Sequence, residues 1–250
     1  MGKYFTFAIC VLLCGCSTLQ VPPEFLYSEI KTPDYTIATW QKITDTTKPY
    51  KIYIEGDGHS FDSDGYPTDN PTPKGTLLRE IAFGDKHPNV VYLARPCQFV
   101  KDSHCKGTDW TIGRFSQKIV SSEYQAVKKI ADSHKITLVG FSGGAQIAGL
   151  IAVQNPDLDI AKLVTIAGNL DVITWTEYHN VPFLSESLDL HDFKQKYALF
   201  PQTHYVGDND EIVPLAITFD FVADKSNIRL IKGASHNSGW EKAFAAIRGE

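Results

Sequence analysis

Ser142 is the residue of this sequence whose surroundings point most directly to chemistry. Residues 140–144 read Gly-Phe-Ser-Gly-Gly, a G-x-S-x-G pattern that joins a predicted strand at 136–141 to a predicted helix at 143–154. A serine at such a turn presents its hydroxyl above the sheet, and the N–H of Gly143 faces an oxyanion that forms there. The pattern indicates a nucleophilic serine, and the alternative is a glycine-rich turn with a surface serine.

In this strand–turn–helix setting the motif resembles the nucleophile turn of the α/β-hydrolase superfamily, and the resemblance covers approximately residues 50–245. In that family an acid and then a histidine follow the serine. Residues 203–214 resemble the family's G-x-x-D-x-x-V-P segment, and this alignment selects Asp210 as the acid. Asp208 is the competing acid, because it is equally near the predicted strand end, and its alternative role is capping or turn formation. His236 follows the final predicted strand, where the family places its histidine.

The resemblance implies a Ser-His-Asp triad that works without a cofactor. A serine hydroxyl is a poor nucleophile near neutral pH, so His236 has to take its proton during attack. Asp210 would orient the imidazole and stabilise its cationic form. Three matches in the required order favour this interpretation over a solvated loop histidine.

A glycine-containing turn after the first core strand is the candidate for the rest of the oxyanion hole. The family has an H-G-G-G or H-G-x turn here, and Glu55 stands where the histidine is usual. By alignment the backbone N–H groups of Asp57 and Gly58 are donors, with Gly143 as the third. We expect the Asp57 side chain to turn away, because a carboxylate would repel the oxyanion. The alternative is a Gly-Asp-Gly turn with no catalytic part.

The elements that must position these residues alternate between strand and helix patterns within one domain. Strands are predicted at residues 35–40, 50–55, 89–94, 136–141, 161–167, 203–206 and 227–231, and helices at residues 75–83, 115–134, 143–154, 214–224 and 238–247. This alternation predicts an α/β fold with a mostly parallel central sheet flanked by helices. Such sheets place their chemistry beyond the carboxyl ends of the strands.

The stretch from residue 168 to residue 201 lies where the family commonly inserts a cap. It is short and carries six aromatic residues: Trp175, Tyr178, Phe183, Phe193, Tyr197 and Phe200. These rings could line a substrate pocket, or they could form a satellite core under a long loop. Either way, we expect an α/β-hydrolase fold with a short cap segment.

The first 16 residues have the pattern of a targeting signal. One cation, Lys3, precedes an apolar run at residues 4–13 that is too short to span a bilayer. Residues 13–16, Leu-Cys-Gly-Cys, resemble a bacterial lipobox, in which Cys16 becomes lipid-modified; the alternative is an ordinary cleaved secretory signal. We expect a tether at residues 17–34, a domain at residues 35–250, and a lipid-anchored protein of the bacterial cell envelope, on the periplasmic side or at the surface.

Two cysteines remain outside this leader, Cys97 and Cys105, and both lie in a polar loop. An oxidising compartment favours a disulfide between them. The alternatives are two free thiols or a metal site with His104, which offers too few ligands. Residues 62–65 resemble part of a calcium loop, but positions 60 and 71 lack the required acids, so we expect no metal.

Composition narrows the choice of function. The chain has 250 residues and a formal net charge of −5, and no basic stretch supplies the footprint that nucleic-acid binding requires. We therefore expect a membrane-anchored serine hydrolase that cleaves small carboxylic esters or thioesters. The alternatives are a peptidase or amidase of the same fold, or a non-catalytic hydrolase-like lipoprotein that binds envelope components.

Overall fold

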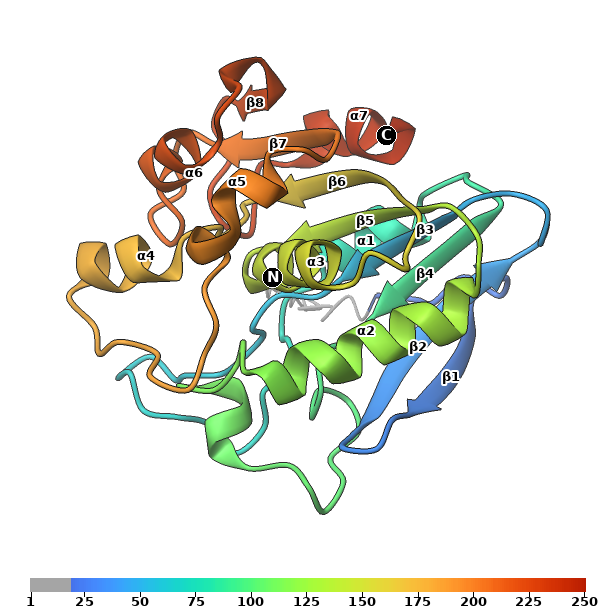
Figure 1. Cartoon of the computed structure of the whole chain (residues 1–250), viewed down its shortest axis with the longest axis horizontal. Coiled ribbons are helices and arrows are strands. Elements are labelled where there is room, and N and C mark those ends of the chain that lie inside the picture. The colour runs from blue at the N-terminus through green and yellow to red at the C-terminus, as the bar shows by residue number, and fades with distance from the viewer. Residues whose placement is uncertain (1–18) are drawn as a thin grey trace, which may run out of the picture.

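The computed structural model describes residues 19–250 of the chain. Its centre is one eight-stranded sheet in the order β1-β2-β4-β3-β5-β6-β7-β8 (Figure 1). β2 pairs antiparallel with both β1 and β4, and the remaining neighbours pair parallel. The strands are β1 (Leu26–Lys31), β2 (Thr36–Ile43), β3 (Tyr50–Ile54), β4 (Asn89–Leu93), β5 (Ile136–Phe141), β6 (Ile160–Ile166), β7 (Gln202–Gly207) and β8 (Ile228–Ile231).

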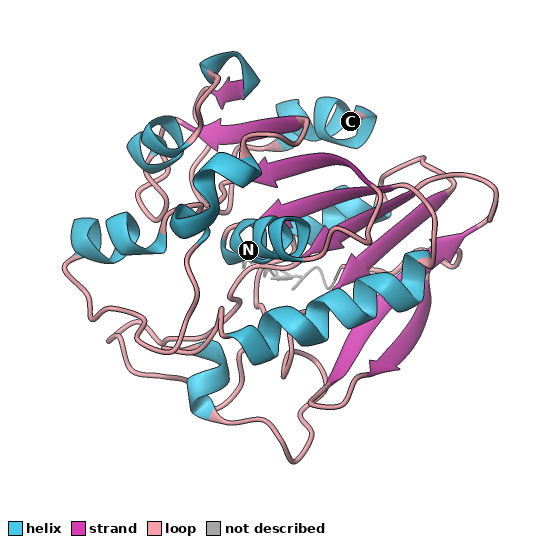
Figure 2. Ribbon diagram, viewed as in Figure 1, coloured by secondary structure: helices cyan, strands magenta, loops and turns pink. Residues whose placement is uncertain are grey.

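Helices cover both faces of the sheet (Figure 2). They are α1 (Leu77–Phe83), α2 (Gln117–Ala131), α3 (Gly143–Gln154), α4 (Val172–His179), α5 (Lys194–Tyr197), α6 (Leu215–Phe221) and α7 (Phe244–Gly249). Successive residues of β3 point to opposite faces. Ile52 belongs to a buried cluster with α2 and α3, and Tyr53 belongs to a second cluster with α1 and α7. The predicted α/β class, a mostly parallel sheet between helices, is confirmed.

The strand and helix on either side of Ser142 have the predicted bounds, β5 at Ile136–Phe141 and α3 at Gly143–Gln154. Every residue of α3 from Gly143 to Val153 is buried. Such a helix lies inside the protein rather than on its surface, and it forms a rigid base for the turn that precedes it.

The tether predicted for residues 17–34 is wrong in part. Leu26–Lys31 forms β1, and all six of its residues pair with β2 at the edge of the sheet. Four of the first five side chains of β1 are exposed, so the segment lacks the apolar pattern of a core strand. Ile30 is the one side chain of β1 that is buried in the core, and backbone pairing with β2 holds the rest of the strand in the sheet.

Between β6 and β7 the chain forms α4, a 3-10 helix at Leu190–Phe193 and α5, and none of these is predicted from the sequence. The six aromatic residues of this segment divide between the two expected roles. Trp175 lines the cleft beside Ser142, whereas Tyr197 is buried in the core, and Phe193 and Phe200 pack against that core. Tyr178 and Phe183 are exposed.

No helix within residues 19–250 is long and apolar enough to cross a membrane. Cys16, the predicted lipidation site, lies outside the described residues, as does the rest of the predicted leader.

Candidate active site

Ser142 occupies the turn between β5 and α3 with a φ of 51°. This left-handed conformation costs a residue other than glycine about 1–3 kcal/mol, which the surrounding structure has to supply. Two glycines make room for the turn. A Cβ atom at Gly140 would lie 2.5 Å from backbone atoms of Ala145, and one at Gly144 would lie 2.3 Å from the carbonyl oxygen of Ile54. Neither position accepts a side chain, and Ser142 is held at the carboxyl end of β5.

A continuous chain of hydrogen bonds links Ser142, His236 and Asp210. Oγ of Ser142 lies 3.0 Å from Nε2 of His236, and Nδ1 of His236 lies 2.9 Å from Oδ2 of Asp210 and 3.2 Å from Oδ1. The Asp210 carboxylate is fully buried, and its Oδ1 accepts hydrogen bonds from the N–H groups of Ile212 and Val213, both at 2.9 Å. These two bonds fix the carboxylate, which in turn fixes the imidazole.

Asp208, the competing acid, makes a different contact. Its Oδ1 accepts a hydrogen bond from the backbone N–H of Gly233 at 2.6 Å, in the loop that leaves β8. The carboxylate thereby ties the loop after β7 to the loop that carries His236. Asp208 therefore has a structural role, and Asp210 is the carboxylate that contacts the imidazole of His236.

The turn after β3 lies directly against Ser142. A Cβ atom at Gly56 would lie 3.1 Å from Cβ of Ser142. Glu55, which stands where the family has a histidine, is buried: its Oε1 accepts the N–H of Gly56 at 2.8 Å and its Oε2 accepts the hydroxyl of Tyr92 at 2.6 Å. Burial raises the pKa of Glu55. The side-chain amide of Gln98 donates to the carbonyl of Gly56 at 2.9 Å, so the turn is fixed from two sides.

The three N–H groups assigned to the oxyanion hole are unoccupied within the described part of the chain. Those of Asp57 and Gly58 donate to no residue of 19–250, and Gly143 is the first residue of α3, where an N–H has no partner inside the helix. Gly58 has a φ of 67°, and a Cβ atom there would lie 2.1 Å from the carbonyl oxygen of Pro71. These N–H groups remain available to a ligand.

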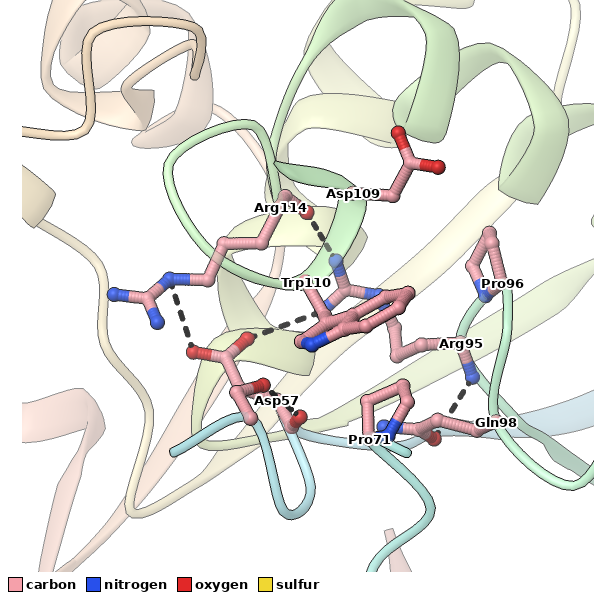
Figure 3. Close-up of a pocket in the computed structure, with 9 residues that line it drawn as sticks. Asp57, Pro71, Arg95, Pro96, Gln98, Asp109, Trp110 and Arg114 are labelled. Carbon is pink, nitrogen blue, oxygen red and sulfur yellow. Dashed lines mark hydrogen bonds and ion pairs between the residues drawn. The ribbon is translucent and has the colours of Figure 1, made fainter. Parts of the chain in front are cut away.

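The Asp57 side chain does not leave the site, contrary to expectation. A Cβ atom at Gly143 would lie 2.1 Å from Oδ1 of Asp57, so the carboxylate rests against the turn of the nucleophile. Two cations hold it: Nη1 of Arg95 lies 3.4 Å from Oδ1, and Nε of Arg114 lies 3.3 Å from Oδ2. Figure 3 shows Asp57 between these two guanidinium groups. Its charge is compensated, which removes the repulsion that would disfavour an oxyanion nearby.

Arg95 and Arg114 belong to a buried charged cluster that is not predicted from the sequence. Nε of Arg95 lies 3.2 Å from Oε1 of Glu123, a side chain with no exposed surface, and burial raises the pKa of Glu123 to about 8. Arg95 follows β4 at the carboxyl end of the sheet, where reactive residues are expected, and that position could have identified it. Arg114 lies in a loop before α2, and no pattern in the sequence marks it.

The site opens into a cleft of about 760 Å³. Ser142, His236, Asn169 and Trp175 line it, together with the turn after β3 and the start of α1. A volume of this size is in the range of pockets that hold small molecules.

Cys97 and Cys105, the cysteines expected to pair, are joined by a disulfide. The bridge closes the loop that follows β4, and it adjoins Gln98, whose amide bonds to Gly56. Among residues 19–250, no group of three or more His, Cys, Asp or Glu side chains is arranged to hold a metal ion.

No protein-family model matches the sequence, and no curated protein matches it. Solved structures resemble the fold. Est1E from Butyrivibrio proteoclasticus has a TM-score of 0.62 at 17% identity, over 89% of this chain and 96% of that one. The Pyrococcus furiosus esterase Pf2001 has a TM-score of 0.63 at 16% identity, over 90% and 91% of the two chains.

XC6422 from Xanthomonas campestris, described as an α/β serine hydrolase without lid, has a TM-score of 0.53 at 14% identity, over 93% of this chain and 94% of that one. These likenesses extend over nearly the whole of each chain. The chain therefore has the α/β-hydrolase fold, and the fold predicted from the motif order is confirmed.

Proposed function

We propose that this protein is a serine hydrolase that cleaves carboxylic esters or thioesters through a covalent acyl-enzyme. The observation that carries the proposal is the 3.0 Å contact between Oγ of Ser142 and Nε2 of His236. That distance permits direct proton transfer from the hydroxyl to the imidazole. Esterases among the proteins that share the fold support the same reaction class.

In the first half of the reaction, Oγ of Ser142 attacks the carbonyl carbon while Nε2 of His236 takes the hydroxyl proton. The carbonyl oxygen becomes an oxyanion. His236 then donates that proton to the leaving alcohol or thiol as the tetrahedral intermediate collapses, which leaves the acyl group on Ser142. In the second half a water attacks the acyl carbon while Nε2 of His236 takes one of its protons. As the bond between the acyl carbon and Oγ breaks, His236 returns that proton to Oγ of Ser142 and the acid is released.

Asp210 acts on this proton transfer through His236. Its buried carboxylate accepts a hydrogen bond from Nδ1–H, which leaves Nε2 free as the base, and its negative charge stabilises the imidazolium. The oxyanion is stabilised by the N–H groups of Asp57, Gly58 and Gly143. Each such donor contributes about 3 kcal/mol of barrier lowering.

Hydrolysis of para-nitrophenyl esters tests the proposal, with acyl chains of two to twelve carbons to measure the preferred length. We expect turnover by the wild type, and Ser142→Ala should lose at least 10³-fold in kcat while keeping the same melting temperature. Cleavage of peptide amides in preference to these esters would favour the peptidase alternative. A folded wild type that hydrolyses neither would favour a binding protein.

We also propose that a lipid on Cys16 anchors the protein to a membrane. The motif at residues 13–16 supports this, and a chain anchored there would leave residues 19–250 as the catalytic part.

A further inference from the structure

Arg114 is a buried cation whose two Nη atoms face the proposed active-site cleft and lack hydrogen-bond acceptors in the described part of the chain. The residue is 5% exposed, yet it lines the cleft that contains Ser142 and His236. Its Nε faces Asp57, and within residues 19–250 neither Nη atom has a hydrogen-bond acceptor. Nε is the buried nitrogen of this guanidinium, whereas Nη1 and Nη2 keep exposed surface and can meet a ligand in the cleft.

The walls around Arg114 hold the guanidinium in one place. It lies over the rings of Phe61 and Trp175, at 5.8 and 5.5 Å from their centroids, and both residues line the same cleft. The ring of Phe115 lies 5.7 Å away. Aromatic faces attract the cation without using its N–H donors, so the planar group stays available for a ligand.

The charge around Arg114 is out of balance. Arg95 and Arg114 share one carboxylate, Asp57, and the second carboxylate, Glu123, contacts only Arg95. Burial raises the pKa of Glu123 to about 8, which favours its neutral form at pH 7. Burial and the neighbouring Arg95 lower the pKa of Arg114, and Asp57 opposes this shift. With Glu123 neutral, two guanidinium groups share the one charge of Asp57, and Arg114 is the cation of this cluster that lines the cleft.

We propose that Arg114 is a specificity-determining residue that binds a carboxylate or phosphate group carried by the substrate. Guanidinium groups pair with either anion through two parallel hydrogen bonds, and Nη1 and Nη2 supply them here. Asp57 contacts both Arg114 and the turn of Ser142, so the anion site lies within one small molecule's length of the nucleophile. The preferred substrates are then small anionic esters or thioesters. This inference rests on the proposed hydrolase function.

Matched ester pairs test it. Ethyl hydrogen glutarate carries a carboxylate on its acyl part, and 4-butanoyloxybutanoate carries one on its alcohol part; ethyl butyrate and butyl butyrate are the neutral partners. Proton release at constant pH gives kcat/KM for each. We expect the wild type to prefer at least one anionic ester over its neutral partner by tenfold or more, and to lose that preference as salt is added.

Arg114→Gln should reduce this anionic-to-neutral ratio at least tenfold, and Arg114→Lys should reduce it less. Lys74→Gln is the matched control, because Lys74 is an exposed cation that lines the same cleft. We expect it to change the ratio by less than threefold. Equal losses in Lys74→Gln and Arg114→Gln would overturn the proposal in favour of a diffuse positive field.

Competition identifies the anion. Glutarate and inorganic phosphate are added separately during ethyl butyrate hydrolysis, and the inhibition constant of each is measured for the wild type and for Arg114→Gln. The anion whose inhibition constant rises more in Arg114→Gln is the one that the site prefers. Inhibition by both that is insensitive to Arg114→Gln would overturn the proposal.

If the variants fail to fold, the ester preference of the wild type alone still tests the inference. A wild type that hydrolyses the neutral esters as well as the anionic ones overturns this inference and leaves the hydrolase function standing. A wild type that hydrolyses none of the four esters removes the hydrolase function and this inference together.

Discussion

Nδ1 of His236 lies 2.9 Å from Oδ2 of Asp210, whereas Asp208, two residues earlier, bonds to the backbone of Gly233. We expect Asp210→Asn to lower kcat by about 10³–10⁴-fold, because an amide does not stabilise the imidazolium and allows the wrong tautomer. Asp208→Asn keeps an oxygen acceptor for Gly233 and should cost less than tenfold. Ester hydrolysis by both variants measures this, and a larger loss in Asp208→Asn would refute the assignment of the acid.

A Cβ at Gly143 would lie 2.1 Å from Oδ1 of Asp57, so a side chain there has to displace the Asp57 carboxylate from its two arginines. We expect Gly143→Ala to displace the Asp57 side chain, and through it the turn that carries the Asp57 and Gly58 N–H groups, and to lower kcat by about 10²–10³-fold. Gly107→Ala is the control, since a Cβ there meets nothing within 4 Å. Unchanged kcat in a folded Gly143→Ala protein would exclude these N–H groups as oxyanion donors.

The Cys97–Cys105 disulfide closes a loop with a sequence separation of 8 residues. By chain entropy such a bridge contributes about 2–3 kcal/mol to the free energy of unfolding. We expect the double substitution Cys97→Ser and Cys105→Ser to lose this amount in urea unfolding, and reductant should lower the stability of the wild type alone. Activity should fall as well, because Gln98 adjoins Cys97 and holds Gly56. Equal stability of the two proteins would show that the bridge does not form.

His204 predicts a dependence of stability on pH. The ring is buried, with Nδ1 2.8 Å from Oγ1 of Thr165 and Nε2 2.8 Å from Oε1 of Gln202. Burial lowers its pKa from 6.5 to about 3. Between these values the unfolded chain binds a proton that the folded chain does not, so this contribution to stability is complete above 6.5 and is lost as the pH falls below it.

His204→Gln should therefore lose about 2 kcal/mol less than the wild type when the pH falls from about 7.5 to about 5. Urea unfolding at both pH values measures the difference. His104→Gln is the control, because the His104 ring is 61% exposed. Parallel pH curves for His204→Gln and the wild type would show that His204 is not held neutral in the folded state.

The lipid anchor predicts that Cys16→Ser moves the expressed protein from the membrane fraction to the soluble fraction, since no acyl chain would be attached. Metabolic labelling with a fatty-acid analogue should mark the wild type and leave Cys16→Ser unmarked. Unchanged partitioning together with an unlabelled wild type would leave an ordinary cleaved signal as the better interpretation.

The sequence predicts those parts of the fold and site that depend on local chemistry. β5 and α3 are recognisable because an apolar run, a small-residue turn and an apolar helix follow one another around Ser142. His236 and Asp210 are found by their order along the chain and their distance from strand ends, and hydrogen bonds join them in the structure. The resemblance of residues 203–214 to the family's segment selects Asp210 over Asp208, and the two carboxylates make the different contacts that this choice requires.

The parts of the fold and site that the sequence does not predict are those formed by tertiary contacts. β1 lacks an apolar pattern because Ile30 is its one buried side chain and the rest of the strand joins the sheet through its backbone. Arg95, Arg114 and Glu123 come from separate loops and a helix, and only the folded chain brings them around Asp57. The sequence does not distinguish a buried arginine from an exposed one, so burial and charge balance become visible only in the structure.

Covalent labelling tests whether Ser142 is a nucleophile that His236 activates. A fluorophosphonate should add one adduct per protein molecule, and peptide mass spectrometry should place it on Ser142. His236→Gln should slow the labelling by at least 10³-fold without unfolding the protein. An unlabelled, folded wild type, or an adduct on a different residue, would contradict the account.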